Sequence, residues 1–193
     1  IAAKGFKVCL SGDAGDELFG GYRRHIYTSV LNSFRINSLV SSNLRSSLPF
    51  GFFENNRLIN AFINCSSSLN YYDVLTRFTS KFQLKLLFKE AFEIKSLNLP
   101  KTSSLFEDVL SLDLKYYMHN DILRKTDSAS MSNSLEIRSP FLDSNLFDYS
   151  CYLNKANKTG FFKGKLILRK LLDKYLDGNY RNPKKLGFGM PFD

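Results

Sequence analysis

Three carboxylates gather near the start of the chain, in the stretch "LSGDAGDELFGGY" (residues 10–22), although the formal net charge of the 193 residues is +9. The spacing of three residues places Asp13 and Asp16 near one side of a turn that leads into a helix. The helix N-terminus and nearby backbone amides favour the ionised forms of these acids, so they suit cation binding better than proton donation. Mg²⁺ takes one or two carboxylates together with phosphate oxygens. The stretch therefore predicts a corner for a metal ion and a phosphorylated ligand.

The same stretch also has a purely structural interpretation. A strand, a tight turn and a helix with an acidic first turn would carry similar residues, because helix N-termini favour negative charge. Ser11 and Gly12 support the ligand interpretation, since small residues at a strand end let a nucleotide approach the backbone closely. A calcium loop of the EF-hand type is excluded, because the alternating ligands and the terminal glutamate are missing.

Two predicted elements position this corner. The run "FKVCL" (residues 6–10) is short, apolar and partly β-branched, which predicts a buried strand. The run "DELFGGYRRH" (residues 16–25) contains helix formers up to a Gly-Gly break. Strand, turn and short helix in this order are typical of α/β proteins, in which ligands bind at the carboxyl ends of parallel strands.

A second group of charged residues lies in an otherwise apolar segment and comprises Asp121, Arg124, Lys125, Asp127, Glu136, Arg138 and Asp143. Charges this dense cannot all be buried without partners, because an isolated buried charge is very costly. They form a structural ion-pair network or line a polar cleft. For Glu136 and Arg138 the structural alternative is favoured, because such a pair more often fixes geometry than performs chemistry.

The surrounding pattern predicts three helices: one that ends near Tyr117, one over about residues 120–135, and one after Pro140. The segment "NDILRK" opens the second helix with a cap at Asn120 and an acidic first turn. Pro140 favours an extended break before it. Residues 136–138 are therefore expected at a helix end or just past it.

The remaining segments carry weaker signals. Residues 27–100 predict two or three helices around an irregular segment, with no catalytic pattern. A basic helix is expected over residues 165–175, followed by a loop rich in Gly, Asn and Pro that carries Lys184 and Lys185. Such a loop can close over an anionic ligand, with a lysine neutralising phosphate charge, or it can be a solvated tail.

Composition limits the remaining possibilities. The length and the 44% hydrophobic content fit one domain, or a domain with part of another. An excess of 27 Lys and Arg over 18 Asp and Glu attracts anions such as nucleotides, but it is dispersed and accompanies no nucleic-acid motif. The three cysteines lack metal-ligand spacing and are expected as reduced core residues. Without a bilayer-spanning run or a signal peptide, we expect a cytoplasmic protein with no membrane partner.

Several blocks occur in the order and approximate spacing of the synthetase domain of glutamine-hydrolysing asparagine synthetases. They are "LSGDAGDELFGGY" (10–22), "DILRKTDSASMSNSLEIRSPFLD" (121–143), "LRK" (168–170) and "KKLGFGMP" (184–191). The chain resembles this family, which implies a helix-rich α/β fold: a partial ATP-pyrophosphatase domain of the adenine nucleotide alpha-hydrolase-like type with remnant parallel strands. The resemblance also implies that ATP and Mg²⁺ convert aspartate to a β-aspartyl-AMP intermediate with release of pyrophosphate. Ammonia derived from glutamine then gives asparagine and AMP.

The resemblance also implies roles for individual residues of the first block. Ser11 and Gly12 would contact ATP. Asp13 would lie near the adenylate intermediate and act as a base for the incoming ammonia. Asp16 would be a Mg²⁺ ligand, with Glu17 as a nearby carboxylate that shapes the nucleotide site.

In the last block, Lys185 matches the family's pyrophosphate-stabilising lysine, with Lys184 as the alternative. The sequence also departs from the family pattern. Ser128 stands where many members carry an arginine, which bears on the identity of the substrate.

The family's Ser-Gly-Gly-x-Asp-Ser loop and its N-terminal cysteine nucleophile are missing from the sequence, and both lie upstream in the family. We therefore expect residues 1–193 to be the C-terminal part of a synthetase domain that is inactive alone. Its ammonia would come from an upstream glutaminase domain, and the protein could form a homodimer. Two alternatives remain open: a paralogue that amidates another carboxylate, for example in surface-polysaccharide biosynthesis, and a non-catalytic nucleotide-binding remnant.

Overall fold

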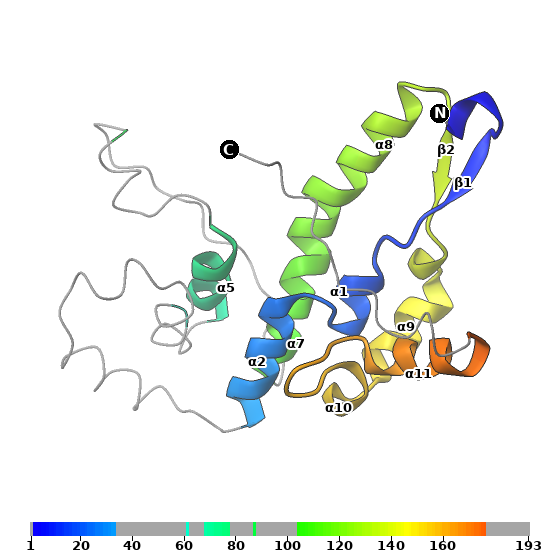
Figure 1. Cartoon of the computed structure of the whole chain (residues 1–193). Coiled ribbons are helices and arrows are strands. Elements are labelled where there is room, and N and C mark those ends of the chain that lie inside the picture. The colour runs from blue at the N-terminus through cyan, green and yellow to red at the C-terminus, as the bar shows by residue number, and fades with distance from the viewer. Residues whose placement is uncertain (1, 34–60, 62–67, 78–86, 88–103, 177–193) are drawn as a thin grey trace, which may run out of the picture.

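The computed structural model describes residues 2–33, 61, 68–77, 87 and 104–176. Lys184, Lys185 and most of the segment 27–100 lie outside the described residues. The described elements are η1 (Ala2–Lys4), β1 (Val8–Leu10), α1 (Gly15–Phe19), α2 (Arg23–Ser33), α5 (Ser68–Thr76), α7 (Leu105–Leu112), the π-helix η3 (Asp113–Leu123), α8 (Arg124–Met131), β2 (Glu136–Arg138), η4 (Pro140–Leu142), α9 (Ser144–Tyr152), α10 (Lys155–Lys158) and α11 (Leu166–Tyr175). The fold is helix-rich α/β, as predicted (Figure 1).

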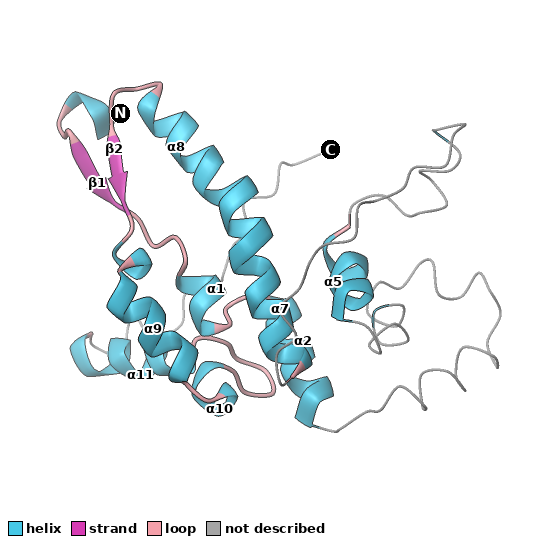
Figure 2. Cartoon of the chain, turned by 180° about the vertical axis from the view of Figure 1, so that it is seen from behind, coloured by secondary structure: helices cyan, strands magenta, loops and turns pink. Residues whose placement is uncertain are grey.

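A parallel pair of strands forms the sheet of the described residues. Val8 of β1 lies opposite Glu136 of β2, and Leu10 lies opposite Arg138. The ladder continues past the strands, because the Ser11 amide donates to the Arg138 carbonyl at 2.9 Å. Figure 2 shows both strands at one end of the molecule, beside the tip of α8. The prediction of remnant parallel strands is thus confirmed.

The apolar side chains of the strand predicted over residues 6–10 are more exposed to solvent than the sequence predicts. Phe6, Val8 and Leu10 are 67%, 40% and 75% exposed. Strands of parallel sheets usually have both faces covered. Within the described residues β1 pairs with β2 alone, and a two-strand sheet has too little surface around it to bury its side chains. The prediction of a buried strand is therefore wrong for this structure.

One continuous helical rod runs through α7, η3 and α8, where two separate helices were predicted (Figure 1). Residues 105–131 contain neither glycine nor proline, so nothing stops the helix near Tyr117. Asn120 is not a cap, because it lies inside the π-helix. The cap is Ser104 at the start of α7, whose side chain accepts a hydrogen bond from the Glu107 amide.

The two helices predicted for the last third of the described chain are confirmed. Helix α9 follows Pro140 after a short 3-10 turn, and the Asp143 side chain caps it by accepting from the amides of Asn145 and Leu146. Helix α11 begins at Leu166, one residue later than predicted. Residues 136–138 follow the end of α8, as expected, but they form strand β2.

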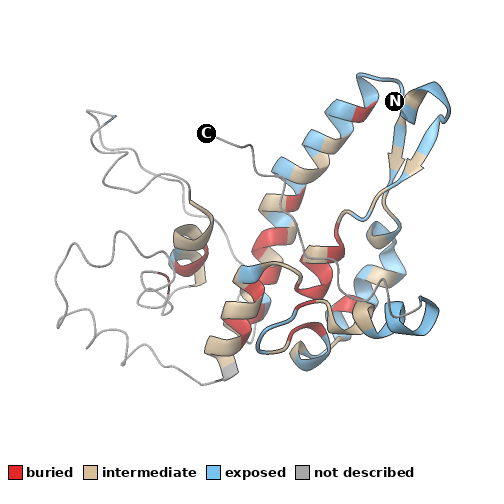
Figure 3. Ribbon diagram, viewed as in Figure 1, coloured by how far each residue is buried: buried red, intermediate tan, exposed pale blue. Residues whose placement is uncertain are grey.

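Two hydrophobic clusters hold the described elements together (Figure 3). One joins α5 to α7 and is built on Tyr71, Tyr72, Val109 and Leu112, with Ala61. The other packs Leu18 and Phe19 of α1 against Met118 of η3. The predicted corner therefore rests directly on a packed core through α1.

The cysteines depart from the expected core positions. Cys9 is half-buried and Cys151 is exposed, both as free thiols, and Cys65 lies outside the described residues. Among the described helices, none has the length and apolar character that crossing a bilayer demands.

Candidate active site

The turn after β1 brings three of the predicted site residues together. The Ser11 hydroxyl donates to the Asp13 carboxylate at 2.9 Å. Gly12 is exposed, and no atom lies within 4 Å of the position that a Cβ would take there. This open backbone stands at the carboxyl end of a parallel strand, where α/β proteins bind their ligands.

Two features constrain the backbone of this turn, one at Asp13 and one at Ala14. The Ser139 hydroxyl, which follows β2, donates to the Asp13 carbonyl at 2.5 Å. The next residue, Ala14, is fully buried and has a left-handed φ of 71°. Such a conformation is uncommon for a residue with a Cβ and persists where the surroundings determine it. The backbone at Asp13 is therefore held by a contact from the residue that follows β2.

Asp16 lies against the Gly-Gly corner that follows α1. A Cβ on Gly21 would lie 1.7 Å from Asp16 Oδ1, so a larger residue there would force this carboxylate to shift. The same oxygen lies 3.0 Å from Lys165 Nζ. Lys165 was not identified from the sequence, because the contact joins distant parts of the chain and no local pattern marks it.

A loop from the last third of the described chain packs on the Gly20–Gly21 corner. Thr159 and Gly164 form an antiparallel bridge, and a Cβ on Gly164 would lie 2.2 Å from the Gly20 carbonyl oxygen. The Lys165 amide donates to the Phe19 carbonyl at 3.2 Å. We call residues 159–165 the corner loop. Its docking is what brings the Lys165 side chain to Asp16.

Glu17 points away from this surface. It is 1% exposed, and its carboxylate accepts a 2.5 Å hydrogen bond from the Tyr22 hydroxyl. Burial raises the pKa of Glu17, and the hydrogen bond from Tyr22 only partly opposes that rise. In this structure Glu17 anchors α1, and its contact with a nucleotide stays a prediction.

A buried polar network lies behind Tyr22. Asp113, the first residue of η3, accepts hydrogen bonds from Arg24 Nε at 2.7 Å, His25 Nε2 at 2.5 Å and the Tyr72 hydroxyl at 2.6 Å. Burial alone would raise the pKa of Asp113, but the hydrogen bonds from His25 and Arg24 outweigh it and hold the pKa below its usual range. Sequence reasoning did not identify this network, which joins three helices.

The Arg24 guanidinium also stacks on the Tyr22 ring, at 4.1 Å from its centroid. Tyr22 in turn holds Glu17 of α1. The network is therefore linked through Tyr22 to the helix that carries Asp16.

Two exposed ion pairs lie within the charged group between residues 121 and 143. Glu136 and Arg138 pair with each other at 2.7 Å on the exposed side of β2. Asp121 and Lys125 form a second exposed pair at 3.7 Å. These are surface pairs that contribute little stability. Ser128 is exposed on α8.

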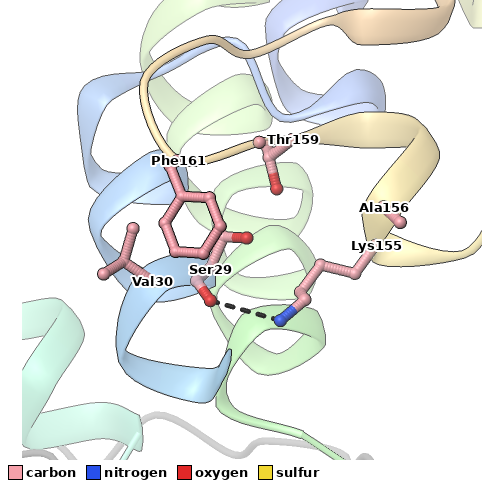
Figure 4. A pocket seen from close by; sticks show the side chains of 7 residues that line it. Ser29, Val30, Lys155, Ala156, Thr159 and Phe161 are labelled. Atoms are coloured by element: carbon pink, nitrogen blue, oxygen red, sulfur yellow. Dashed lines mark hydrogen bonds between the residues drawn. The ribbon is translucent and has the colours of Figure 1, made fainter. Parts of the chain in front are cut away.

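A cavity of about 240 Å³ lies between α2, α10 and the corner loop (Figure 4). Ser29, Lys155, Thr159 and Phe161 are among its lining residues, and Lys155 Nζ donates to the Ser29 carbonyl at 3.2 Å. No carboxylate is among the lining residues of this cavity. This cavity therefore offers no carboxylate for a metal ion, and the metal and phosphate chemistry of the Ser11–Asp16 corner stays a prediction.

The donors at the corner fit a magnesium ion that arrives with a phosphorylated ligand. Within the described residues, no group of three or more His, Cys, Asp or Glu side chains could hold a metal by itself. Mg²⁺ needs only one or two protein carboxylates when phosphate oxygens complete its shell. Asp13 in the turn and Asp16 in the first turn of α1 carry such carboxylate oxygens.

The described structure is a helix-rich α/β fold with a carboxylate-bearing corner at the end of a parallel strand. The chain belongs to the asparagine synthase family, whose description, "Asparagine synthase", matches residues 1–193. It is 32% identical over 205 residues to "Asparagine synthetase [glutamine-hydrolyzing] 1" of Bacillus subtilis (strain 168), covering 98% of this chain and 32% of that relative.

A protein of Mycobacterium bovis that is provisionally named a glutamine-hydrolysing asparagine synthetase is 31% identical over 204 residues, covering 98% of this chain and 30% of its own length. The chain thus spans about a third of the length of the curated relatives it matches. No solved structure matches it at a significant level.

Proposed function

We propose that the chain is part of an ATP-dependent amide-forming ligase that converts aspartate to asparagine. The side-chain carboxylate of aspartate attacks the α-phosphate of ATP, which releases pyrophosphate and gives β-aspartyl-AMP. Ammonia then attacks the activated carbonyl carbon, and AMP leaves. The observation that supports the proposal is that Ser11, Gly12 and Asp13 follow the carboxyl end of β1, with Ser11 hydrogen-bonded to Asp13 and with Asp16 in the helix that comes next, in a chain that matches this family over its whole length.

Each residue of the corner has a proposed task that its position supports. Ser11 and Gly12 leave the backbone open for the nucleotide, since both side chains are small and Gly12 is exposed. Asp13 would take a proton from the attacking ammonia, and its hydrogen bond from Ser11 fixes the carboxylate that does so. Asp16 would hold Mg²⁺, which when bound supplies charge neutralisation for the departing pyrophosphate.

A lysine that binds pyrophosphate and a source of ammonia are also needed, and both lie beyond the described residues. Lys185 would stabilise the negative charge on pyrophosphate, with Lys184 as the alternative. Ammonia would come from glutamine through a glutaminase domain elsewhere in the full-length protein, a source that fits the glutamine-hydrolysing names of the relatives.

The test is pyrophosphate release by the full-length protein with ATP, Mg²⁺, aspartate and either glutamine or ammonium. We expect release that depends on aspartate and yields asparagine. Release with another carboxylate but not with aspartate would identify a paralogue, and Ser128, which stands where many family members carry an arginine, bears on that choice of substrate. ATP binding without pyrophosphate release, for any carboxylate supplied, would show a non-catalytic remnant.

A further inference from the structure

The contact between Lys165 and Asp16 has the properties of a built interaction. Lys165 Nζ lies 3.0 Å from Asp16 Oδ1, and the two side chains are only 32% and 23% exposed. Ionic attraction is stronger at partly shielded sites than at exposed ones, because less water screens the charges. The ammonium occupies the carboxylate oxygen that faces Gly21.

The backbone of Lys165 is held in place at a conformational cost. Its φ of 56° and ψ of 40° lie in the left-handed region, which is unfavourable for a residue with a Cβ. Its amide donates to the Phe19 carbonyl at 3.2 Å, and the Arg169 Nε donates to the neighbouring Gly164 carbonyl at 2.9 Å. Strained residues that the surroundings hold in this way cluster at functional sites. The corner loop therefore delivers this ammonium to Asp16.

We propose that Lys165 is the counter-ion of Asp16 in the nucleotide-free protein and competes with a divalent cation for the same carboxylate. This inference rests on the proposed function in one respect, the assignment of Asp16 as the metal ligand. A cation that binds this carboxylate comes close to the ammonium, which lies 3.0 Å from Oδ1, and the repulsion between the two positive charges favours displacement of the ammonium. The displaced ammonium then lies beside the metal, where it can pair with a phosphate oxygen of the incoming ligand.

This arrangement predicts an order of events at the corner. A metal ion alone gains Asp16 but must break the ion pair with Lys165. A metal ion that arrives with a phosphorylated ligand also gives Lys165 a new anionic partner. The corner therefore discriminates against free divalent cations and favours the metal complex of a nucleotide.

The experiment is a titration of the nucleotide-free, full-length protein with Mn²⁺, followed by electron paramagnetic resonance of the free ion. Lys165→Asn removes the charge with a residue that tolerates the left-handed conformation. We expect this variant to bind Mn²⁺ about three- to tenfold more tightly than the wild type. Lys165→Arg keeps the charge and Lys170→Asn removes an exposed charge from α11, so both should stay within about twofold of the wild type.

Two further variants keep the result decisive. Adding Asp16→Asn to Lys165→Asn should abolish the gain, because the tighter site depends on that carboxylate. Lys165→Gly, which suits the left-handed backbone best, replaces Lys165→Asn if the latter folds poorly. Unchanged or weaker Mn²⁺ binding in the charge-removing variants would overturn the inference.

A failure of the proposed function would be detected separately, in the assay of pyrophosphate release. The wild-type protein would then release no pyrophosphate with any carboxylate, whereas the Mn²⁺ titration needs neither nucleotide nor turnover.

Discussion

At the scale of single residues, the most specific prediction concerns the activity and stability of a variant at Asp16. Asp16→Asn keeps the shape of the side chain but removes the charge that would hold Mg²⁺, so pyrophosphate release should fall by about a hundredfold or more. Unfolding free energy should change by less than about 1 kcal/mol, because the pair with Lys165 is partly exposed. Steady-state assays and thermal unfolding of the full-length protein check both numbers. Asp148→Asn, an exposed change on α9, is the control.

A comparable loss of stability and activity in Asp16→Asn would favour the structural interpretation of the acidic turn. In that case the carboxylate would serve mainly to hold the Gly-Gly corner.

Gly21 offers a test of how closely Asp16 is placed. In Gly21→Ala the new methyl group would overlap the Asp16 carboxylate, whose Oδ1 lies 1.7 Å from the Cβ position. We expect activity to fall by about tenfold or more, since a displaced catalytic group costs rate steeply. Gly5→Ala is the matched control, because nothing lies within 4 Å of its Cβ position. Full activity in Gly21→Ala would show that the exact position of Asp16 is unimportant.

At this scale the sequence predicted the residues that share one short stretch and missed their distant partners. Ser11, Gly12, Asp13 and Asp16 follow one strand, so their proximity is a local property. Lys165 and Ser139 reach the corner only through tertiary packing of the corner loop and of the β1–β2 pair. No spacing rule relates such residues.

At the scale of elements, the continuous rod of α7, η3 and α8 predicts which residue caps it. Ser104→Ala should destabilise the protein by about 1 kcal/mol, because the side chain accepts from the Glu107 amide at the helix start. Asn120→Ala should be neutral or stabilising by a few tenths of a kcal/mol, because an exposed helical Asn gives way to a better helix former. Denaturant unfolding of the two variants side by side decides this. A larger loss in Asn120→Ala would restore the two-helix interpretation.

The network that joins α2 to η3 predicts a pH dependence. His25 is fully buried, and burial is the main cause that holds its pKa below the ordinary value of 6.5. The unfolded chain therefore binds a proton more readily than the folded one as the pH falls through that value. Stability should thus decline on acidification below about pH 6.5.

The variant His25→Gln removes this titration while its side-chain amide can still donate to Asp113. The fall in thermal midpoint between about pH 7.5 and about pH 5.5 should be smaller in this variant than in the wild type. His119→Gln changes an exposed histidine of η3 and should leave the fall unchanged. An identical pH response in all three proteins would exclude His25 as its source.

The sequence predicted best those helices whose start or end is marked by a proline, a glycine or a capping residue. Pro140 and the cap residue Asp143 mark the start of α9, and the glycines after Phe19 mark the end of α1. The π-helix η3 has no such mark, because its hydrogen bonds shift within an uninterrupted run of helix-forming residues. Strand β2 is three residues long, too short for alternation to show, and it exists because β1 offers it an edge.

At the scale of the whole molecule, several elements of the described structure pack around residues 11–21, which include the predicted site residues Ser11 to Glu17. The second hydrophobic cluster packs α1 against η3, the β1–β2 ladder extends to Ser11 before α1, and the corner loop packs on Phe19 and Gly20 at the end of α1. Family membership extends over all 193 residues, but the relatives are about three times as long. Tests of catalysis therefore belong on the full-length protein.

The most direct test of the proposed function follows an oxygen atom. Aspartate labelled with heavy oxygen in its side-chain carboxylate is incubated with the full-length protein, ATP, Mg²⁺ and ammonium, and the products are analysed by mass spectrometry. If the carboxylate attacks the α-phosphate and AMP later leaves with that oxygen, each asparagine formed leaves one heavy oxygen in AMP. Label in inorganic phosphate, together with ADP, would contradict the adenylate route, and AMP without label would show that aspartate is not the group activated.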